Sequence, residues 1–197
     1  MNYQEKIEAC LREHNGMITS AYCKKQGIPT IYLTRMVRDG SLIRVAAGLY
    51  IMPDSSYDEL FIFQYQFKKT VFSYETALFL LGKTDRIPEI IEVTVASSYR
   101  FNQLPPKVHV NFVIPEILDL GVVSVQTMYG NTVRAYGYER VLCDLIAHKE
   151  KADAETYVKA IQGYARYPGK NVHLLREISG KMGISKQVRE IMEVAYE

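Results

Sequence analysis

The fold of this chain is decided by residues 19–50, TSAYCKKQGIPTIYLTRMVRDGSLIRVAAGLY. The stretch predicts a short helix over residues 20–26, which Gly27 closes because glycine tolerates the left-handed conformation at a helix end. Pro29 then suits the first turn of a second helix, since its ring fixes φ and its missing N–H is not needed there. That helix runs to about Asp39, where a glycine follows. The order is helix, tight turn, helix.

A β-hairpin is predicted directly after these helices. Residues 42–45 and 49–52 are runs rich in β-branched and aromatic side chains, and Ala46-Ala47-Gly48 between them is typical of a turn. Pro53 ends the second strand because it has no N–H to donate to a ladder. Two helices followed by a hairpin is the order of a winged helix-turn-helix.

The segment before this stretch supplies the remaining helix of that fold. Asn2 and Glu5 have the spacing of a capping pair that opens a helix, and Gly16 is suited to end it. We therefore expect residues 1–54 to form a winged helix-turn-helix domain, with the boundary near Asp54 and Ser55.

A second domain is predicted over residues 55–197. Ser56 and Glu59 resemble a capping box, so a helix is expected from there to about Lys69. Its aromatic side chains lie on several sides, which favours a helix buried between the two domains. These aromatic residues are Tyr57, Phe61, Phe63, Tyr65 and Phe67.

The rest of the second domain mixes strands and helices. Alternation of apolar and polar residues, with Ile91, Val93 and Val95 pointing inward and Glu92 and Thr94 outward, predicts the first strand. The predicted strands are 88–96, 108–114, 122–129 and 133–136, and the predicted helices are 74–81, 138–149, 153–166, 171–182 and 185–196. The fold class is therefore α+β: a winged helix-turn-helix followed by a mixed α/β domain with a helical C-terminus.

Positive charge is concentrated in the deciding stretch. The whole chain has a formal net charge of +2, whereas residues 19–50 hold five basic side chains against Asp39 alone, a net charge of +4. Residues 55–197 balance, with 17 basic and 17 acidic side chains. A local excess of cations on a small helical domain is where a surface for nucleic acid is expected.

Helical spacing divides residues 29–39 into two faces. Leu33, Met36 and Val37 share the face that packs on the other helices, whereas Arg35 and Arg38 lie opposite. A recognition helix needs this division, because one face is fixed by packing and the other offers donors to base edges in the major groove. A charged helix face that is merely solvated, or a winged helix that binds protein, are the alternatives.

We predict a base contact for Arg35, because guanidinium can pair bidentately with guanine, and phosphate contacts for Lys24, Lys25 and Arg44. The complete set of predicted DNA-binding residues is Thr19, Lys24, Lys25, Thr30, Ile31, Thr34, Arg35, Arg38 and Arg44.

Other classes of protein find little support. Three scattered cysteines, Cys10, Cys23 and Cys143, are expected to be buried thiols. No stretch approaches the ~20 apolar residues of a membrane span, and the N-terminus does not resemble a secretory signal, so a cytoplasmic protein without membrane contact is expected. The four histidines are too scattered for a metal site, and no phosphate-binding or nucleophile motif occurs, so no cofactor is expected.

Two acidic arrangements invite a catalytic interpretation. A nuclease-type metal site would need a lysine two residues after Glu92, and Thr94 stands there instead. Glu139, Arg140 and Asp144 fall on one predicted helix, where residues four apart are neighbours, so an intrahelical or interdomain ion pair is favoured over an active site. We predict no enzymatic activity.

Several blocks of this sequence resemble the AbiE abortive-infection antitoxin family (AbiEi-like, type IV toxin–antitoxin systems). The first runs from Gly16 to Tyr50 and covers the winged helix. Further blocks are Ser73-Tyr74-Glu75-Thr76-Ala77-Leu78, Thr84-Asp85-Arg86-Ile87-Pro88 and Tyr136-Gly137-Tyr138-Glu139-Arg140-Val141-Leu142-Cys143-Asp144-Leu145. They occur in the family's order over residues 16–146, whereas residues 150–197 match no motif.

The resemblance implies a bacterial antitoxin and autorepressor. It implies binding to inverted repeats of double-stranded DNA at the chain's own promoter, a second domain that counters a nucleotidyltransferase-like toxin encoded next door, and a role in phage defence. A winged-helix transcription factor that senses a ligand without a toxin partner is one alternative, and a nuclease-like enzyme is another. The operator, the oligomeric state and the role of residues 150–197 stay open.

Overall fold

The computed structural model describes residues 2–196 and divides into two compact units. Unit 1 holds residues up to 68 together with 127–131, and unit 2 holds 69–126 and 132 onward. The predicted functional boundary near residue 54 stays a prediction.

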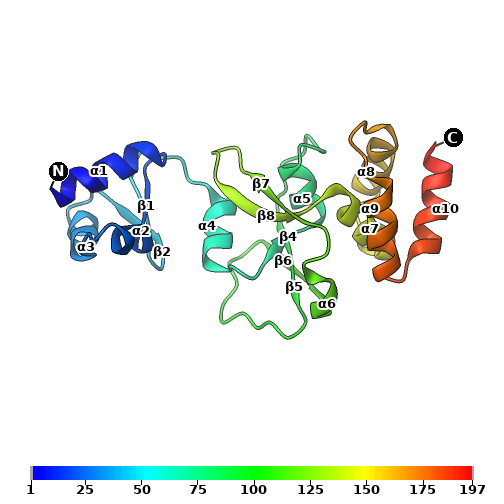
Figure 1. Cartoon of the computed structure of the whole chain (residues 1–197), viewed down its shortest axis with the longest axis horizontal. Coiled ribbons are helices and arrows are strands. Elements are labelled where there is room, and N and C mark those ends of the chain that lie inside the picture. Colours follow the sequence, from blue (N-terminus) through cyan, green and yellow to red (C-terminus); the bar gives the residue numbers. More distant parts are fainter. Residues whose placement is uncertain (1, 197) are drawn as a thin grey trace. The chain divides into compact units, whose positions relative to one another are not determined.

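Unit 1 has the element order of a winged helix-turn-helix, as the sequence predicts (Figure 1). Its three strands form an antiparallel sheet in the order β1-β3-β2. Its elements are α1 (Tyr3–Glu13), β1 (Met17–Thr19), α2 (Ser20–Lys25), α3 (Ile31–Arg38), β2 (Ile43–Ala46), β3 (Leu49–Ile51) and α4 (Glu59–Gln66). The sequence did not reveal β1, because a run of three residues is too short for a period and pairs with β3 only in the folded chain.

The predicted ends of α1 are confirmed. Asn2 Oδ1 accepts the Glu5 N–H at 2.8 Å, and the Glu5 carboxylate accepts the Asn2 N–H at 2.8 Å. Gly16 follows the helix with φ +78°, and a Cβ there would lie 2.6 Å from Ser55 Cβ. Glycine is required at this position both for the left-handed backbone and for the close approach of residue 55.

Helix α4 begins later than predicted. Its N-cap is Asp58 rather than Ser56: Asp58 Oδ1 accepts the Phe61 N–H at 3.0 Å, and the helix ends at Gln66. Asp58 is buried, and its Oδ2 also accepts the Thr127 hydroxyl at 2.5 Å and Asn131 Nδ2 at 2.8 Å. These partners are distant in sequence, so the capping box at Ser56 was an incorrect prediction that local spacing could not correct.

The aromatic side chains of this segment do not form one buried group. Phe63 is buried, but Tyr57 precedes the helix and is 56% exposed. Burial of the helix between two domains therefore stays a prediction, and Tyr57 does not belong to such a cluster.

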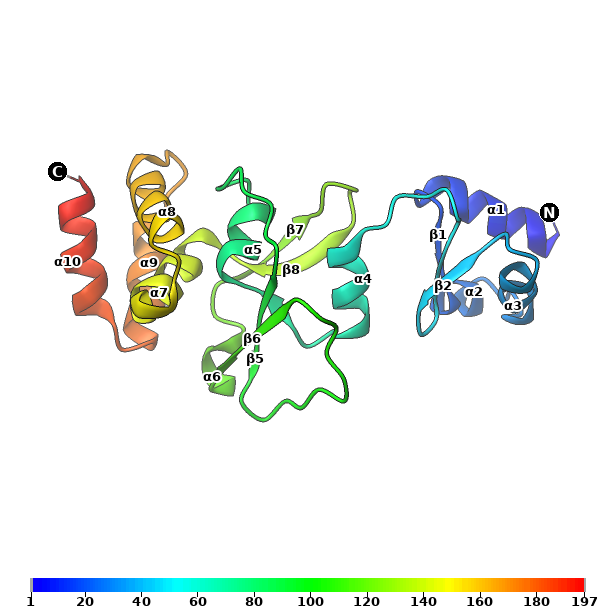
Figure 2. The same cartoon turned by 180° about the vertical axis from the view of Figure 1, so that it is seen from behind.

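Unit 2 is built on a five-stranded sheet in the order β6-β5-β4-β8-β7. Figure 2 labels four of its strands, β5, β6, β7 and β8. The pairs β5–β6 and β4–β8 are parallel, and the pairs β4–β5 and β7–β8 are antiparallel. The strands are β4 (Val71–Phe72), β5 (Ile91–Ala96), β6 (Val108–Val113), β7 (Val122–Gln126) and β8 (Thr132–Tyr136).

The sequence placed β5 correctly in the chain but described its faces wrongly. The strand starts at Ile91, not residue 88, and Thr94 is fully buried between Val93 and Val95. Glu92 does not point to solvent, because its carboxylate accepts the Glu75 N–H at 2.8 Å. Three consecutive residues, Val93, Thr94 and Val95, are buried, so the strand does not show simple alternation. Strand β7 also ends earlier than predicted, at Gln126.

The C-terminal part of unit 2 is helical, as predicted (yellow to red in Figure 1). Among the described residues, no helix has the length and apolar character to cross a membrane. The helices of the unit are α5 (Tyr74–Leu80), α6 (Pro115–Leu118), α7 (Tyr138–Ala147), the 3₁₀ turn Lys149–Lys151, α8 (Ala154–Arg166), α9 (Val172–Lys181) and α10 (Ser185–Tyr196).

Candidate nucleic-acid interface

Helix α3 has the two faces that its sequence predicts. Leu33 is fully buried in the core of unit 1, and Met36 and Val37 pack partly buried against the same core. The opposite side is exposed to solvent, with Arg35 and Arg38 in its last turn. The exposed residues of the helix also include Ile31 and Thr34.

The core fixes the orientation of this helix within unit 1. Ile7, Cys10 and Leu11 of α1 meet Cys23 of α2 and Leu33 of α3 in one buried cluster. A side chain in such a cluster contacts many neighbours, so rotating α3 about its axis would open cavities. Packing of the buried side therefore fixes the direction in which the exposed side of α3 faces.

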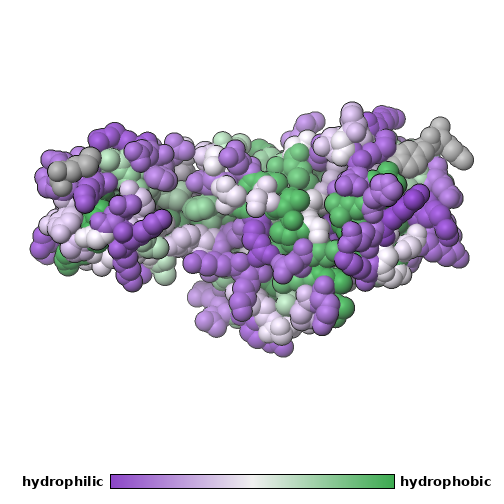
Figure 3. Space-filling model, viewed as in Figure 1, coloured by the Kyte–Doolittle hydropathy of each residue, from purple (hydrophilic) through white to green (hydrophobic). Residues whose placement is uncertain are grey.

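The five cations of residues 19–50 are all exposed on unit 1. Lys24 and Lys25 lie in the last turn of α2, Arg35 and Arg38 in the last turn of α3, and Arg44 on β2. Within the described residues none of them forms an ion pair with a carboxylate. On the face shown in Figure 3, hydrophilic residues cover most of unit 1.

Asp39, the acidic residue of this stretch, makes its hydrogen bonds to the turn that follows α3. Asp39 Oδ1 accepts the Ser41 hydroxyl at 2.6 Å and the Ser41 N–H at 3.0 Å, and these bonds lower the pKa of the carboxyl. Asp39 thereby orders the turn after α3, because its carboxylate accepts both hydrogen bonds from Ser41 in that turn.

Two of the predicted DNA-binding threonines lie at helix starts. The Thr19 hydroxyl accepts the Tyr22 N–H at 3.0 Å and caps α2, so its oxygen already stabilises the start of that helix. Thr30 is the N-cap residue of α3, but its side chain makes no capping hydrogen bond and is exposed. DNA contacts by either threonine stay predictions.

The wing, which is the hairpin of β2 and β3, is short, and hydrogen bonds from other parts of unit 1 hold its tip. In the turn between β2 and β3, the Gly48 carbonyl accepts the Ser20 N–H at 2.8 Å and the Tyr65 hydroxyl at 3.3 Å. Ala46 and Ala47 complete the turn, so the tip carries no cation. Arg44 supplies the charge of this hairpin, and its Nε lies 3.4 Å from the Ala46 carbonyl oxygen.

One residue beside the predicted set was missed from sequence. The Tyr32 ring is partly buried and lies beside the Arg35 guanidinium, with Cζ 5.7 Å from the ring centroid. The spacing of three residues was the available signal, because such residues are neighbours on a helix.

The fold and its exposed cations define unit 1 as a winged helix-turn-helix of the kind found in transcriptional regulators. Residues 5–53, about a quarter of the chain, match the family described as transcriptional regulator, AbiEi antitoxin. This match supports an AbiEi-like antitoxin and agrees with the resemblance of the winged-helix block. No curated protein matches the chain.

In unit 2, the charges on α7 are buried. Arg140 is 0% exposed, its Nε donates to Asp144 Oδ1 at 3.0 Å, and one terminal nitrogen donates to the Leu120 carbonyl at 2.8 Å. Burial raises the pKa of Asp144, and the adjacent guanidinium opposes that rise. The predicted ion pair is present and lies within one helix. Glu139, also buried, accepts the Asn171 N–H at 2.9 Å and the Tyr164 hydroxyl at 3.2 Å.

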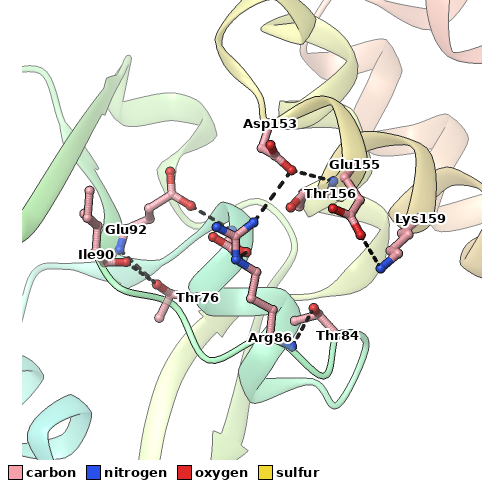
Figure 4. A network of polar contacts seen from close by, with 10 residues as sticks. Thr76, Thr84, Arg86, Ile90, Glu92, Asp153, Glu155, Thr156 and Lys159 are labelled. Carbon is pink, nitrogen blue, oxygen red and sulfur yellow. Dashed lines mark hydrogen bonds and ion pairs between the residues drawn. The ribbon is translucent and has the colours of Figure 1, made fainter.

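A cavity of about 420 Å³ lies in unit 2 at the starts of α5 and α8. Arg86 stands at its edge, 3.4 Å from Glu75 Oε1. It also lies 3.9 Å from Asp153 Oδ1 (Figure 4). Inside, burial raises the pKa of Glu92 to about 7, and Asn111 Nδ2 is buried without a hydrogen-bond partner among the described residues. The lining of the cavity thus combines these polar groups with the apolar side chain of Leu145.

Neither catalytic interpretation gains a metal site. No group of three His, Cys, Asp or Glu side chains within residues 2–196 has the arrangement to hold a metal ion. The three thiols are buried and free, as predicted, and burial raises the pKa of Cys23 to about 11 and of Cys143 to about 12. A thiol with a raised pKa is a poor nucleophile at neutral pH.

Proposed function

We propose that this chain is the antitoxin of a bacterial toxin–antitoxin system and the repressor of its own promoter. In this proposal residues 1–54 bind inverted repeats in double-stranded DNA, and residues 55–197 counter a nucleotidyltransferase-like toxin. The protein acts in the cytoplasm as part of a defence against bacteriophage.

One observation carries the proposal. The residues that match the AbiEi antitoxin regulators are those that fold into the winged helix, and every cation of residues 19–50 on that winged helix is exposed. Cations without a carboxylate partner are available to phosphates, and release of DNA counterions then favours binding. A solvated but inactive face would need no such concentration of one sign of charge.

The regulatory part is tested with the chain's own upstream DNA. We expect the full chain to shift this duplex in a mobility assay and to protect an inverted repeat from cleavage. Arg35→Ala should weaken binding to that repeat by ~1–3 kcal/mol and relax the base preference at one position in each half-site. An unchanged binding isotherm for Arg35→Ala would remove Arg35 from the interface.

The antitoxin part is tested by co-expression with the neighbouring reading frame. We expect that frame alone to arrest growth and the full chain to restore it. The doubly substituted chain Arg35→Ala, Arg38→Ala should still restore growth from a heterologous promoter, because its changes lie in unit 1. A harmless neighbouring frame would contradict the antitoxin proposal.

Exposed apolar side chains on unit 2 support a protein partner there. Phe112 on the edge strand β6 is 55% exposed, and Ile114 just after it is 57% exposed. Hydrophobic residues also gather over part of unit 2 in Figure 3. Contiguous apolar surface on a folded protein commonly marks an interaction site.

The cavity of unit 2 favours a second candidate function, a transcription factor that senses a small ligand. Its size falls in the range of ~300–1,000 Å³ typical of ligand sites, and it combines apolar and polar lining. In that case a small molecule, rather than a toxin, would release the promoter. A promoter fusion that responds to culture conditions in a strain without the neighbouring frame would favour this candidate over the antitoxin.

We propose no catalytic role for the chain. Thr94 occupies the position where a nuclease of the restriction type would place lysine, and it is buried between two valines. Purified protein with Mg²⁺ should leave plasmid and linear DNA intact over hours. Cleavage that is lost in Glu92→Gln would overturn this.

A further inference from the structure

Two tyrosines and an arginine contact one another in series on unit 1. The Tyr3 and Tyr32 rings have centroids 5.4 Å apart with an interplanar angle of 55°, and Arg35 Cζ lies 5.7 Å from the centroid of Tyr32. Tyr3 is the first residue of α1, and Tyr32 and Arg35 belong to α3. The order of contacts is therefore ring, ring, guanidinium.

This arrangement restricts Arg35 without neutralising it. A guanidinium within about 6 Å of an aromatic ring is attracted to it and keeps its hydrogen-bond donors available. The Tyr32 ring is itself held, because it packs against the core of unit 1 and contacts the Tyr3 ring. Arg35 thus loses less rotamer freedom when it binds than an arginine that extends into solvent.

Arg38 offers the comparison within the same helix turn. It is exposed, and among residues 2–196 no hydrogen bond, ion pair or ring contact engages its guanidinium. A mobile cation suits a phosphate, which can be approached from many directions, whereas bidentate pairing with guanine needs a fixed plane.

We propose that Tyr32, backed by Tyr3, is a specificity-determining residue of this protein, which positions Arg35 for a guanine edge. The inference rests on the proposed binding of DNA by unit 1. Tyr32 acts through Arg35 and touches no base itself. Arg38, without a ring beside it, contributes to affinity and not to the choice of sequence.

The test is a double-mutant cycle on the full chain, with the duplex selected from a random library and a scrambled duplex of equal length as the reference. A cation–π contact at an exposed site contributes ~0.5–1 kcal/mol, so Tyr32→Leu should lower the preference for the selected duplex about twofold to fivefold. Tyr32→Phe should retain the preference, because it keeps the ring. In the Arg35→Ala background, Tyr32→Leu should cause no further loss.

Equal losses from Tyr32→Leu with and without Arg35 would overturn the proposal, since they would indicate a purely structural role. Loss of preference in Tyr32→Phe, or none in Tyr32→Leu, would overturn it as well. Should Tyr32→Leu fail to fold, nuclear Overhauser effects between the Tyr32 ring and the Arg35 side chain in the wild type decide: their presence supports the contact, and their absence refutes it. If the wild type binds no DNA at all, the proposed function fails instead.

Discussion

Helices α3 and α7 carry the same kinds of residues, but their arginines lie in opposite environments. Each combines an apolar face with arginine, yet Arg35 and Arg38 lie in solvent, whereas Arg140 is fully enclosed beside Asp144. The arginines of α3 have no carboxylate partner within the described residues, and that of α7 also donates to a backbone carbonyl. Exposed arginines without a carboxylate and a buried arginine with one are thus distinguished by their surroundings.

The physical reason for the difference is desolvation. An arginine in water keeps its hydration until phosphate or base replaces it, so exposure costs nothing before binding. A buried arginine must find all its partners inside the protein, and removing any one leaves a charge without compensation. We therefore expect substitutions in α3 to change DNA binding and substitutions in α7 to change stability.

The largest effect is expected at Arg140. Arg140→Met leaves Asp144 buried without its partner, which should lower the free energy of unfolding by ~3–5 kcal/mol. Urea denaturation followed by circular dichroism measures this. Arg134→Met is the matched control, because Arg134 is 40% exposed and pairs with an exposed Asp119, so its loss should cost only ~0–1 kcal/mol. Similar losses for both variants would remove the distinction between buried and exposed arginines.

A buried carboxyl should give unit 2 a pH-dependent stability. Burial raises the pKa of Glu92 from 4.5 to about 7, so the folded state binds a proton more tightly than the unfolded state between these values. The free energy of unfolding should then fall as pH rises through that range, by at most about 3 kcal/mol. Glu92→Gln should lack this loss and be the more stable protein at pH 8. Parallel pH profiles of the two proteins would contradict the burial of a charge here.

A substitution at Asp58 tests, inside unit 1, the cost of removing a buried carboxylate from its hydrogen-bond partners. Asp58→Ala removes the cap of α4 and leaves Thr127 and Asn131 without their acceptor, which should cost about 2 kcal/mol of unfolding free energy. Ser56→Ala is the control, since Ser56 was predicted as the cap and is exposed outside the helix. Thermal unfolding of both variants decides; a larger loss for Ser56→Ala would restore the predicted capping box.

The smallest effects belong to the exposed cations. Lys24→Ala, Lys25→Ala and Arg38→Ala should each leave the melting temperature unchanged. If each contacts one phosphate, each should make the slope of log K against log salt shallower by about 0.9, with equal effects on specific and scrambled duplexes. A change in base preference for Arg38→Ala would show that Arg38 also reads sequence.

Sequence alone determined the winged helix, the excess of positive charge in residues 19–50 and the apolar face of α3. These follow from short-range rules, because caps, glycine breaks and helical spacing act over a few residues. The helical C-terminus and the pairing of Arg140 with Asp144 were predictable for the same reason.

Tertiary structure decided what depends on distant neighbours. Strand β1 forms only beside β3, and Asp58 replaces Ser56 as a cap because it also accepts bonds from Thr127 and Asn131. Glu92 turns inward because its carboxylate accepts the Glu75 N–H. The tilted contact between the Tyr3 and Tyr32 rings likewise joins two helices that lie apart in the sequence. Burial depends on which parts of the chain come together, and residue type and local spacing do not contain that information.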